Sequence, residues 1–326
     1  MKQFTIAPND AAQRLDKFLR KAAPALPQAL LYKALRQKRI KLNGRRAEGA
    51  ARLEAGDIVT CFLPDELFAP PAYAWDFLRA GTALEVLYED ERLLLLNKPA
   101  GLLSHPDEGE YVDTLLGRVQ RYLYEKGEYR PERENAFAPS LCNRIDRNTQ
   151  GIVIAAKTAD ALREINERIK LRQTRKFYLA AVHGEPAAGR RLPGADGQEW
   201  KELRNWLRKD AAKSQVQVYD NPRADAKESL TRYRVLARRG GLSLLEIELL
   251  TGRTHQIRAQ LAHIGHALVG DGKYAPRAQY QADAALGRKR QCLCSWRLTL
   301  GELDVRVPDV EFVHILFPDF DLSQKK

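Results

Sequence analysis

The amino-acid sequence predicts an α+β protein: a small basic unit of two helices and a β-hairpin, followed by a mixed, mainly antiparallel β-sheet domain. Three observations predict this class. Residues 1–64 carry two apolar patterns at helical spacing and hold thirteen Lys and Arg against five Asp and Glu. Residues 65–82 then turn rich in proline, as a linker would. Residues 83–320 mix apolar runs of strand length with a few helical patterns, so we expect two domains.

The N-terminal unit, residues 1–64, begins with two amphipathic helices. In the first, Leu15, Phe18 and Leu19 recur at the spacing of one helical face. The second starts at Pro27, which suits a first helical turn, and ends near Lys38. The cations on the two outer faces are Arg14, Lys17, Lys21, Lys33, Arg36 and Arg39. Such cations favour binding to the phosphates of RNA, and a merely well-solvated face is the simpler alternative.

A β-hairpin and a linker complete this part of the chain. Asn43-Gly44 is a strong signal for a tight turn between two strands, and residues 57–63 read as another strand. The following linker contains Pro70-Pro71, a step that favours a semi-rigid spacer between the domains.

The larger domain opens with a predicted hairpin over residues 84–99, and its later patterns alternate between helix and strand. We expect helices over 114–126, 159–171 and 254–264, a surface loop over 184–198, and strands over 151–156, 177–182, 214–219, 229–238 and 242–250. The last three strands are expected to be antiparallel.

Asp146 is the strongest candidate for chemistry. It stands between Arg144 and Arg147, directly before the apolar strand over 151–156. A guanidinium within a few ångströms keeps a carboxylate ionised, and a nucleophile or base has to be ionised. Taken alone, this motif more often indicates a polar turn that caps a strand.

Four stretches of sequence, taken in order, favour a catalytic role for Asp146 over a polar turn. They are Leu93–Pro106, Asn143–Gly151, Arg175–Gly184, and Thr251–Leu261 with Gly270, Asp271 and Tyr274 after it. Together they resemble the RluA/RluC/RluD family of RNA pseudouridine synthases over most of the chain. The N-terminal unit is similar to the small RNA-binding domain named after a small-subunit ribosomal protein. Two positions depart from the family pattern, because Asn143 stands in place of a histidine and Gln150 in place of a serine.

The resemblance implies roles for individual residues. Asp146 matches the catalytic aspartate, Tyr178 the tyrosine that packs against the target base, and Arg258 the arginine that pairs with the aspartate. Arg144 matches an arginine that helps to extrude the base from folded RNA. The remaining expected contacts are Asn97, Lys98 and His105 at the rim, Arg253 on the pocket or a phosphate, and Val269 as an apolar wall of the uracil site.

The implied activity is isomerisation of specific uridines in structured RNA without a cofactor. Large-subunit ribosomal RNA is the expected substrate, and transfer RNA is the alternative. Whether the aspartate attacks the sugar or the base, or assists a glycal route, stays open. A catalytically inactive ribosome-assembly factor is the rival from another class, motivated by Asn143 and Gln150. An RNA methyltransferase would need a methyl-donor loop, and none is visible.

Composition narrows the remaining classes. A net charge of +12 and a pI near 9.5 favour a polyanionic partner. No apolar run approaches the roughly 20 residues of a membrane span, and the first residues lack a signal peptide's apolar core, so we expect a monomeric, cytoplasmic protein with no membrane partner. The four cysteines are too scattered for a disulfide framework, and neither Cys292 with Cys294 nor the histidines predict a metal site.

Overall fold

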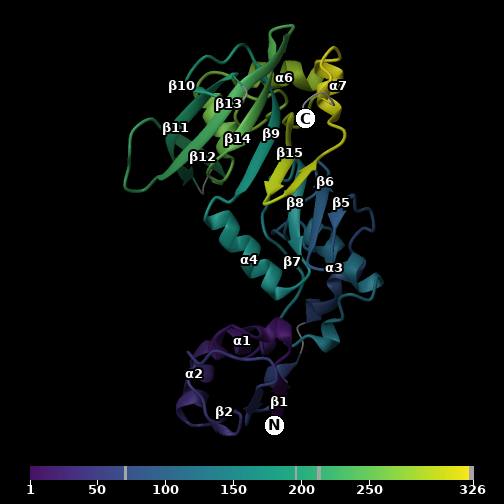
Figure 1. Ribbon diagram of the computed structural model, residues 1–326, viewed down its shortest axis with the longest axis vertical. Coiled ribbons are helices and arrows are strands. Elements are labelled where there is room, and N and C mark those ends of the chain that lie inside the picture. The colour runs from purple at the N-terminus through teal and green to yellow at the C-terminus, as the bar shows by residue number, and fades with distance from the viewer. Residues whose placement is uncertain (70–71, 195–196, 211–213, 323–326) are drawn as a thin grey trace.

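Two β-sheets, one small and one large, organise the chain (Figure 1). The computed structural model describes residues 1–69, 72–194, 197–210 and 214–322. The N-terminal unit forms one end of the molecule, and the large sheet fills the other.

The small sheet holds four antiparallel strands in the order β1 (Lys2–Thr5), β4 (Ile58–Cys61), β2 (Ile40–Leu42) and β3 (Arg45–Arg46). Helices α1 (Leu15–Ala22) and α2 (Gln28–Arg36) complete the unit, and η1 (Pro8–Asp10) precedes them. Phe18 and Leu31 have no exposed surface and belong to one apolar core. The predicted Asn43-Gly44 turn joins β2 and β3, with positive φ at both residues.

The large sheet follows the order β10 (Arg190–Pro193), β11 (Glu199–Asp210), β13 (Lys227–Arg239), β14 (Leu242–Leu249), β9 (Thr174–His183), β15 (Leu293–Leu300), β8 (Gln150–Ala156), β6 (Leu93–Lys98) and β5 (Val86–Glu89). Three strands lie beside this path: β12 (Gln215–Tyr219) on β11, β16 (Leu303–Arg306) on β15, and β7 (Ser140–Leu141) on β8. Strands β8 and β15 pair in parallel, whereas the neighbouring pairs are antiparallel, so the mixed sheet is confirmed.

Helices lie against and beside this sheet. They are α3 (Leu115–Glu125), α4 (Ala159–Lys170), α5 (Gln256–His263), α6 (Arg277–Ala285) and α7 (Glu311–Leu316), with a 3-10 turn η4 (Pro131–Arg133). Thr114 and Thr158 cap α3 and α4 by accepting a backbone hydrogen bond, which explains why both helices start where the apolar periodicity starts.

The segment expected to be a surface loop over 184–198 is partly wrong, because it contains β10. The long strand β11 was also not predicted. Leu203 and Leu207 of β11 are buried, and the residues next to them along the strand are mostly charged. These charges weaken the apolar pattern by which a strand is recognised. β11 pairs with both β12 and β13, so it extends the sheet on the side away from β5.

Strand β8 divides the interior into two cores. Its successive side chains alternate between the core that contains Tyr178 and the core that contains Phe177. Gly151, at φ 121°, lets β8 approach β15, since a Cβ there would stand 2.3 Å from the carbonyl oxygen of Ser295. This close approach fixes the end of β8 that follows Asp146.

The residues expected to form a linker are not extended where they are described. They form the 3-10 helices η2 (Asp65–Phe68) and η3 (Ala72–Arg79), and Phe77 is buried against Tyr124 and Tyr129 of the larger domain. The Pro70-Pro71 step lies outside the described residues.

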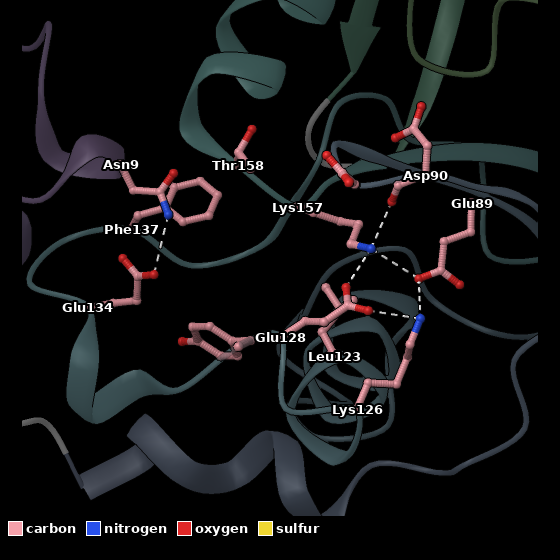
Figure 2. A pocket seen from close by; sticks show the side chains of 12 residues that line it. Asn9, Glu89, Asp90, Leu123, Lys126, Glu128, Glu134, Phe137, Lys157 and Thr158 are labelled. Carbon is pink, nitrogen blue, oxygen red and sulfur yellow. Dashed lines mark hydrogen bonds and ion pairs between the residues drawn. The ribbon is translucent and has the colours of Figure 1, made fainter.

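Polar contacts join the N-terminal unit to the large domain. Asn135 donates to the carbonyl of Thr5 and to Asp10, and Asn9 accepts from the backbone of Ala159 at the start of α4. A cavity of about 710 Å³ lies at this junction (Figure 2). Its two lysines, Lys126 and Lys157, are already paired with Glu89 and Glu128, so they are not left to hold an anionic ligand.

Within the described ranges, no helix is long and apolar enough to cross a membrane. The same part of the chain contains no group of three or more His, Cys, Asp or Glu side chains arranged to hold a metal ion. Cys292 and Cys294 are free and buried at the start of β15, and burial raises the pKa of Cys292 to about 12.

Candidate active site

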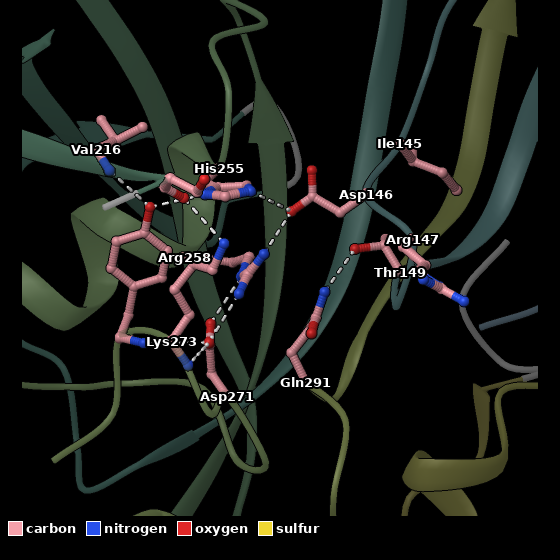
Figure 3. A network of polar contacts seen from close by, with 12 residues as sticks. Ile145, Asp146, Arg147, Thr149, Val216, His255, Arg258, Asp271, Lys273 and Gln291 are labelled. Carbon is pink, nitrogen blue, oxygen red and sulfur yellow. Dashed lines mark hydrogen bonds and ion pairs between the residues drawn. The ribbon is translucent and has the colours of Figure 1, made fainter. Parts of the chain in front are cut away.

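Asp146 lies in the turn that leads from β7 into β8. Its carbonyl accepts a hydrogen bond from the backbone of Thr149, which closes the turn. Its carboxylate is 28% exposed and accepts a hydrogen bond from Nη1 of Arg258, at 2.8 Å from Oδ2 (Figure 3). The carboxylate is therefore open to solvent on one side and fixed by a cation on the other.

Arg258 projects from α5 and joins Asp146 to a second carboxylate, that of Asp271. Its Nε and Nη2 each donate to one oxygen of Asp271 at 2.8 Å, so this pair is bidentate. Asp271 has no exposed surface. Burial alone would lower the pKa of Arg258, but the two carboxylates outweigh it and raise that pKa. Burial likewise opposes ionisation of Asp271, and pairing with Arg258 outweighs it and lowers the pKa of the carboxyl.

His255 and Tyr274 form a second contact chain to Asp146. His255 Nε2 lies 3.8 Å from Oδ2 of Asp146, and Nδ1 lies 2.8 Å from the hydroxyl of Tyr274. That hydroxyl accepts a hydrogen bond from the backbone of Val216. Burial lowers the pKa of His255, which favours the neutral imidazole. The Tyr274 hydroxyl can still donate its own proton to Nδ1 of His255. This hydrogen bond favours the tautomer of His255 that carries its proton on Nε2, facing Asp146.

Tyr178 stands on β9, opposite Ser295 of β15, and is 6% exposed. Burial raises the pKa of its hydroxyl to about 12, and the nearby Asp146 charge adds to the effect. The phenol is therefore protonated at neutral pH. Val269 is buried in the core of Phe177, on the other side of the sheet from Tyr178, so the structure does not place it as a wall beside Tyr178.

Asn97 and Lys98 do not lie at the rim, because β6 is an inner strand between β5 and β8. Asn97 is 6% exposed and donates to Glu85. Lys98 has no exposed surface, and its ammonium nitrogen donates to the carbonyls of Pro99, Leu102 and Arg147. Lys98 therefore ties the turn after β6 to the residue that follows Asp146, and the expectation of direct contact with RNA is corrected for both side chains.

Lys98 should make stability depend on pH. Burial lowers its pKa in the folded protein to about 7, whereas an unfolded lysine titrates near pH 10.4 by a rough reference value. Between these values the unfolded chain binds more protons, so the free energy of unfolding rises with pH. From about pH 7 to about pH 10 we expect the wild type to gain up to about 4 kcal/mol relative to Lys98→Met.

Urea unfolding of the two proteins across this range measures the gain. A constant difference between them would show instead that the three carbonyl oxygens keep Lys98 protonated throughout.

Three other predicted contacts reach the surface. Arg144 and Arg253 are exposed, and Arg253 also donates to the carbonyl of Glu228. His105 is half-buried, and its pKa is lowered by burial and by the charge of Arg144. The departure at Asn143 has a structural use, since its side-chain oxygen accepts from the backbone of Ile154 in β8.

The cations expected to bind RNA on the N-terminal unit are all exposed: Arg14, Lys17, Lys21, Lys33, Arg36 and Arg39. They come from α1, α2 and the residues that flank them. Arg14 differs from the others because it is paired with Asp16 at 2.7 Å.

His255, Asp271 and Tyr274 were not predicted as site residues. All three belong to the stretches that carry the family resemblance, and their short distance from Arg258 along the chain was the available signal. Their contacts come from folding of the segment 268–274 against α5, which no local pattern encodes.

The fold agrees with comparisons to known proteins. The model of the family described as RNA pseudouridylate synthase matches residues 92–263, and the S4 domain model matches residues 13–59. The chain belongs to the RNA pseudouridylate synthase family, in its RluA/RluC branch. It is thus an RNA pseudouridine synthase, an isomerase that carries an N-terminal S4 domain.

Several relatives are named ribosomal large subunit pseudouridine synthase C, and two of them illustrate the likeness. The one from Vibrio cholerae is 31% identical over 93% of this chain and 86% of its own length. The one from Escherichia coli is 29% identical over 85% of this chain and 81% of its own length. The solved structure of human RNA pseudouridylate synthase domain containing 4 has a TM-score of 0.54 at 20% identity, and it covers 71% of this chain and 90% of that chain. That last likeness supports the fold alone.

Proposed function

We propose that this synthase isomerises specific uridines of large-subunit ribosomal RNA with Asp146 as its nucleophile. The observation that carries the proposal is the Asp146 carboxylate, 28% exposed in an open turn and held at 2.8 Å by Arg258. An ionised, oriented and accessible carboxylate is what covalent catalysis by an acid requires. The substrate class is supported by the names of the relatives and by the S4 domain.

The proposed chemistry uses few groups. The bond between ribose and N1 of uracil breaks, the base turns, and C5 joins the sugar. The C5 proton is lost to solvent and N1 takes up a proton in its place, so no external reagent is consumed. Asp146 supplies the electron pair, Arg258 aligns its carboxylate through a hydrogen bond, and Tyr178 packs against the base as a neutral phenol. Because a base inside folded RNA is out of reach, the enzyme must extrude it at a cost of a few kcal/mol, by a rough estimate.

Each part of the chain has a separate role in this proposal. Residues 1–64 bind RNA through the cations on α1 and α2, residues 65–82 connect, and residues 83–320 carry the catalytic site. Arg144, His105 and Arg253 contact the RNA around the extruded base. The enzyme acts as a monomer in the cytoplasm, where ribosomal RNA is accessible before the subunit is complete.

Tritium release tests this function. With RNA labelled at C5 of uridine, we expect release from a large-subunit ribosomal RNA transcript and much less from transfer RNA transcripts. Release from transfer RNA alone would contradict the proposed substrate, and absence of release from both would contradict the activity on these RNAs.

A salt titration tests the role of the N-terminal unit. Replacing Lys17, Lys21, Lys33 and Arg36 with glutamine should weaken RNA binding and lower the slope of log K against log salt by about 0.7 for each phosphate that is no longer neutralised. Substitution is preferable to deletion, because the unit also bonds to Asn135 and Ala159. The control neutralises four exposed cations of the large domain: Lys170, Arg172, Lys227 and Arg277. Equal slopes for both variants would refute the assignment.

A further inference from the structure

Two arginines from distant parts of the chain bind to the turn that follows β6, Ala100–Gly101. Arg147 Nε donates to the carbonyl of Gly101 at 3.0 Å, and Arg290 Nη1 donates to the carbonyl of Ala100 at 3.2 Å. The backbone of Gly101 in turn donates to the carbonyl of Arg147 at 2.8 Å. The two guanidinium groups are therefore anchored to consecutive carbonyls of one turn.

Gly101 makes room for this arrangement. Its φ is 101°, which favours glycine, and a Cβ there would meet three guanidinium atoms of Arg290 at 3.2 to 3.3 Å. Nearly equal distances to three atoms mean that the guanidinium lies with its face against the turn. The turn thus holds Arg290 in a defined position, whereas a free surface arginine samples many rotamers.

The charges of the two arginines are not neutralised by acidic side chains of the described residues. Both arginines are exposed, and within the described ranges no carboxylate lies within ion-pair distance of either one. The Glu110 carboxylate accepts hydrogen bonds from the backbone of Val112 and Asp113, which lower its pKa, and the charge of Arg147 adds to this effect from a distance. Each arginine uses one N–H on a carbonyl, so the others remain available to an anion.

The location relates the pair to catalysis. Arg147 is the residue after Asp146, and its carbonyl is held by buried Lys98. The charge of Arg290 is near enough to lower the pKa of Lys98, while Asp146 acts on the same lysine in the opposite direction. Arg288 and Lys289 directly precede Arg290 in the sequence. An anion bound here would lie beside the nucleotide that Asp146 attacks.

We propose that Arg147 and Arg290, anchored on the Ala100–Gly101 turn, form a clamp for a phosphodiester group of the RNA strand next to the extruded uridine. This inference rests on the proposed function, because it takes RNA to be the molecule at Asp146. A phosphate accepts several N–H donors at once and relieves the repulsion between two neighbouring guanidinium groups. The clamp holds the strand while the base leaves its stack, so it serves binding of the flanking backbone and not recognition of the base.

The test compares full-length variants Arg147→Ala, Arg290→Ala and the double substitution. Binding to a large-subunit ribosomal RNA transcript is measured from about 50 mM to about 200 mM salt, together with tritium release. We expect the double variant to raise Kd about tenfold and to lower the salt slope by about 0.7, the value for one phosphate of single-stranded RNA. KM for the transcript should rise more than kcat falls. Arg290→Lys, which keeps the charge, should retain most of the slope.

Arg239→Ala is the matched control. Arg239 is also exposed, and it also donates to a backbone carbonyl, that of Leu316 at 3.4 Å. It lies before the start of β14, whereas the Arg253–Arg258 segment follows the other end of that strand. It should bind RNA with the Kd and slope of the wild type. Thermal unfolding checks that every variant is folded.

The possible failures are distinguishable. A wild type that binds the transcript but releases no tritium refutes the proposed activity on that RNA. An active wild type with a double variant of unchanged Kd and slope overturns the clamp. A loss of affinity as large in Arg239→Ala as in the double variant overturns it too, because the effect would then follow net charge alone.

Discussion

Asp146→Asn is expected to lower tritium release by at least about 10³-fold, as loss of a catalytic nucleophile does in other enzymes. The amide is nearly the same size as the carboxylate and keeps an oxygen for Arg258 Nη1, which now lies 2.8 Å from Oδ2. It has no negative charge, so it cannot supply the electron pair. RNA affinity should change by less than about threefold, because the exposed cations proposed to contact phosphates are intact.

Asp304→Asn is the control for this substitution. Asp304 is also a partly exposed aspartate paired with an arginine, Arg297, but it belongs to β16. Its loss should leave tritium release near the wild-type level. Retention of more than about a tenth of the activity in Asp146→Asn would argue against a nucleophilic role.

Arg258→Met is expected to damage both stability and activity. It removes the cation between two carboxylates, one of which, Asp271, has no exposed surface. Breaking a buried pair by removing one partner costs about 3–5 kcal/mol, because the remaining charge is uncompensated. Asp146 would lose its fixed donor as well, and we expect activity to fall by about 10²-fold or more.

A second substitution separates the two effects. Asp271→Asn in the Arg258→Met background removes the stranded charge, so urea unfolding should show recovery of part of the stability. Tritium release should not recover, because Asp146 still lacks its partner. Recovery of activity together with stability would mean that Arg258 acts only through the fold.

The fold was largely predictable because the local sequence patterns of its helices and turns match the structure that forms. The helices α1, α2, α3 and α4 follow apolar periodicity, and the turn at Asn43-Gly44 follows from the positive φ that this pair tolerates. β11 was missed because alternate positions carry charges that pair across strands, as Glu202 does with Arg232. Sheet order, including the parallel contact of β8 with β15, depends on residues far apart in sequence.

The candidate site was predictable as residue types but not as positions. Asp146 and Arg258 meet in the structure as the resemblance implied. Lys98 was misassigned because lysine side chains are usually exposed, and only the inner position of β6 shows that this one is buried. Val269 packs in the core that contains Phe177, and this position depends on contacts between segments that are distant in sequence.

The close approach of Gly151 to Ser295 has a consequence for biosynthesis. The turn of Asp146 rests on a strand whose parallel neighbour is made about 140 residues later, and Arg258 also arrives late. A ribosome-bound chain that ends before β15 therefore lacks one wall of its own active site. Pairings between such distant segments form slowly, because a long loop has to close first. The enzyme should thus become catalytically competent only after nearly its whole length has been translated.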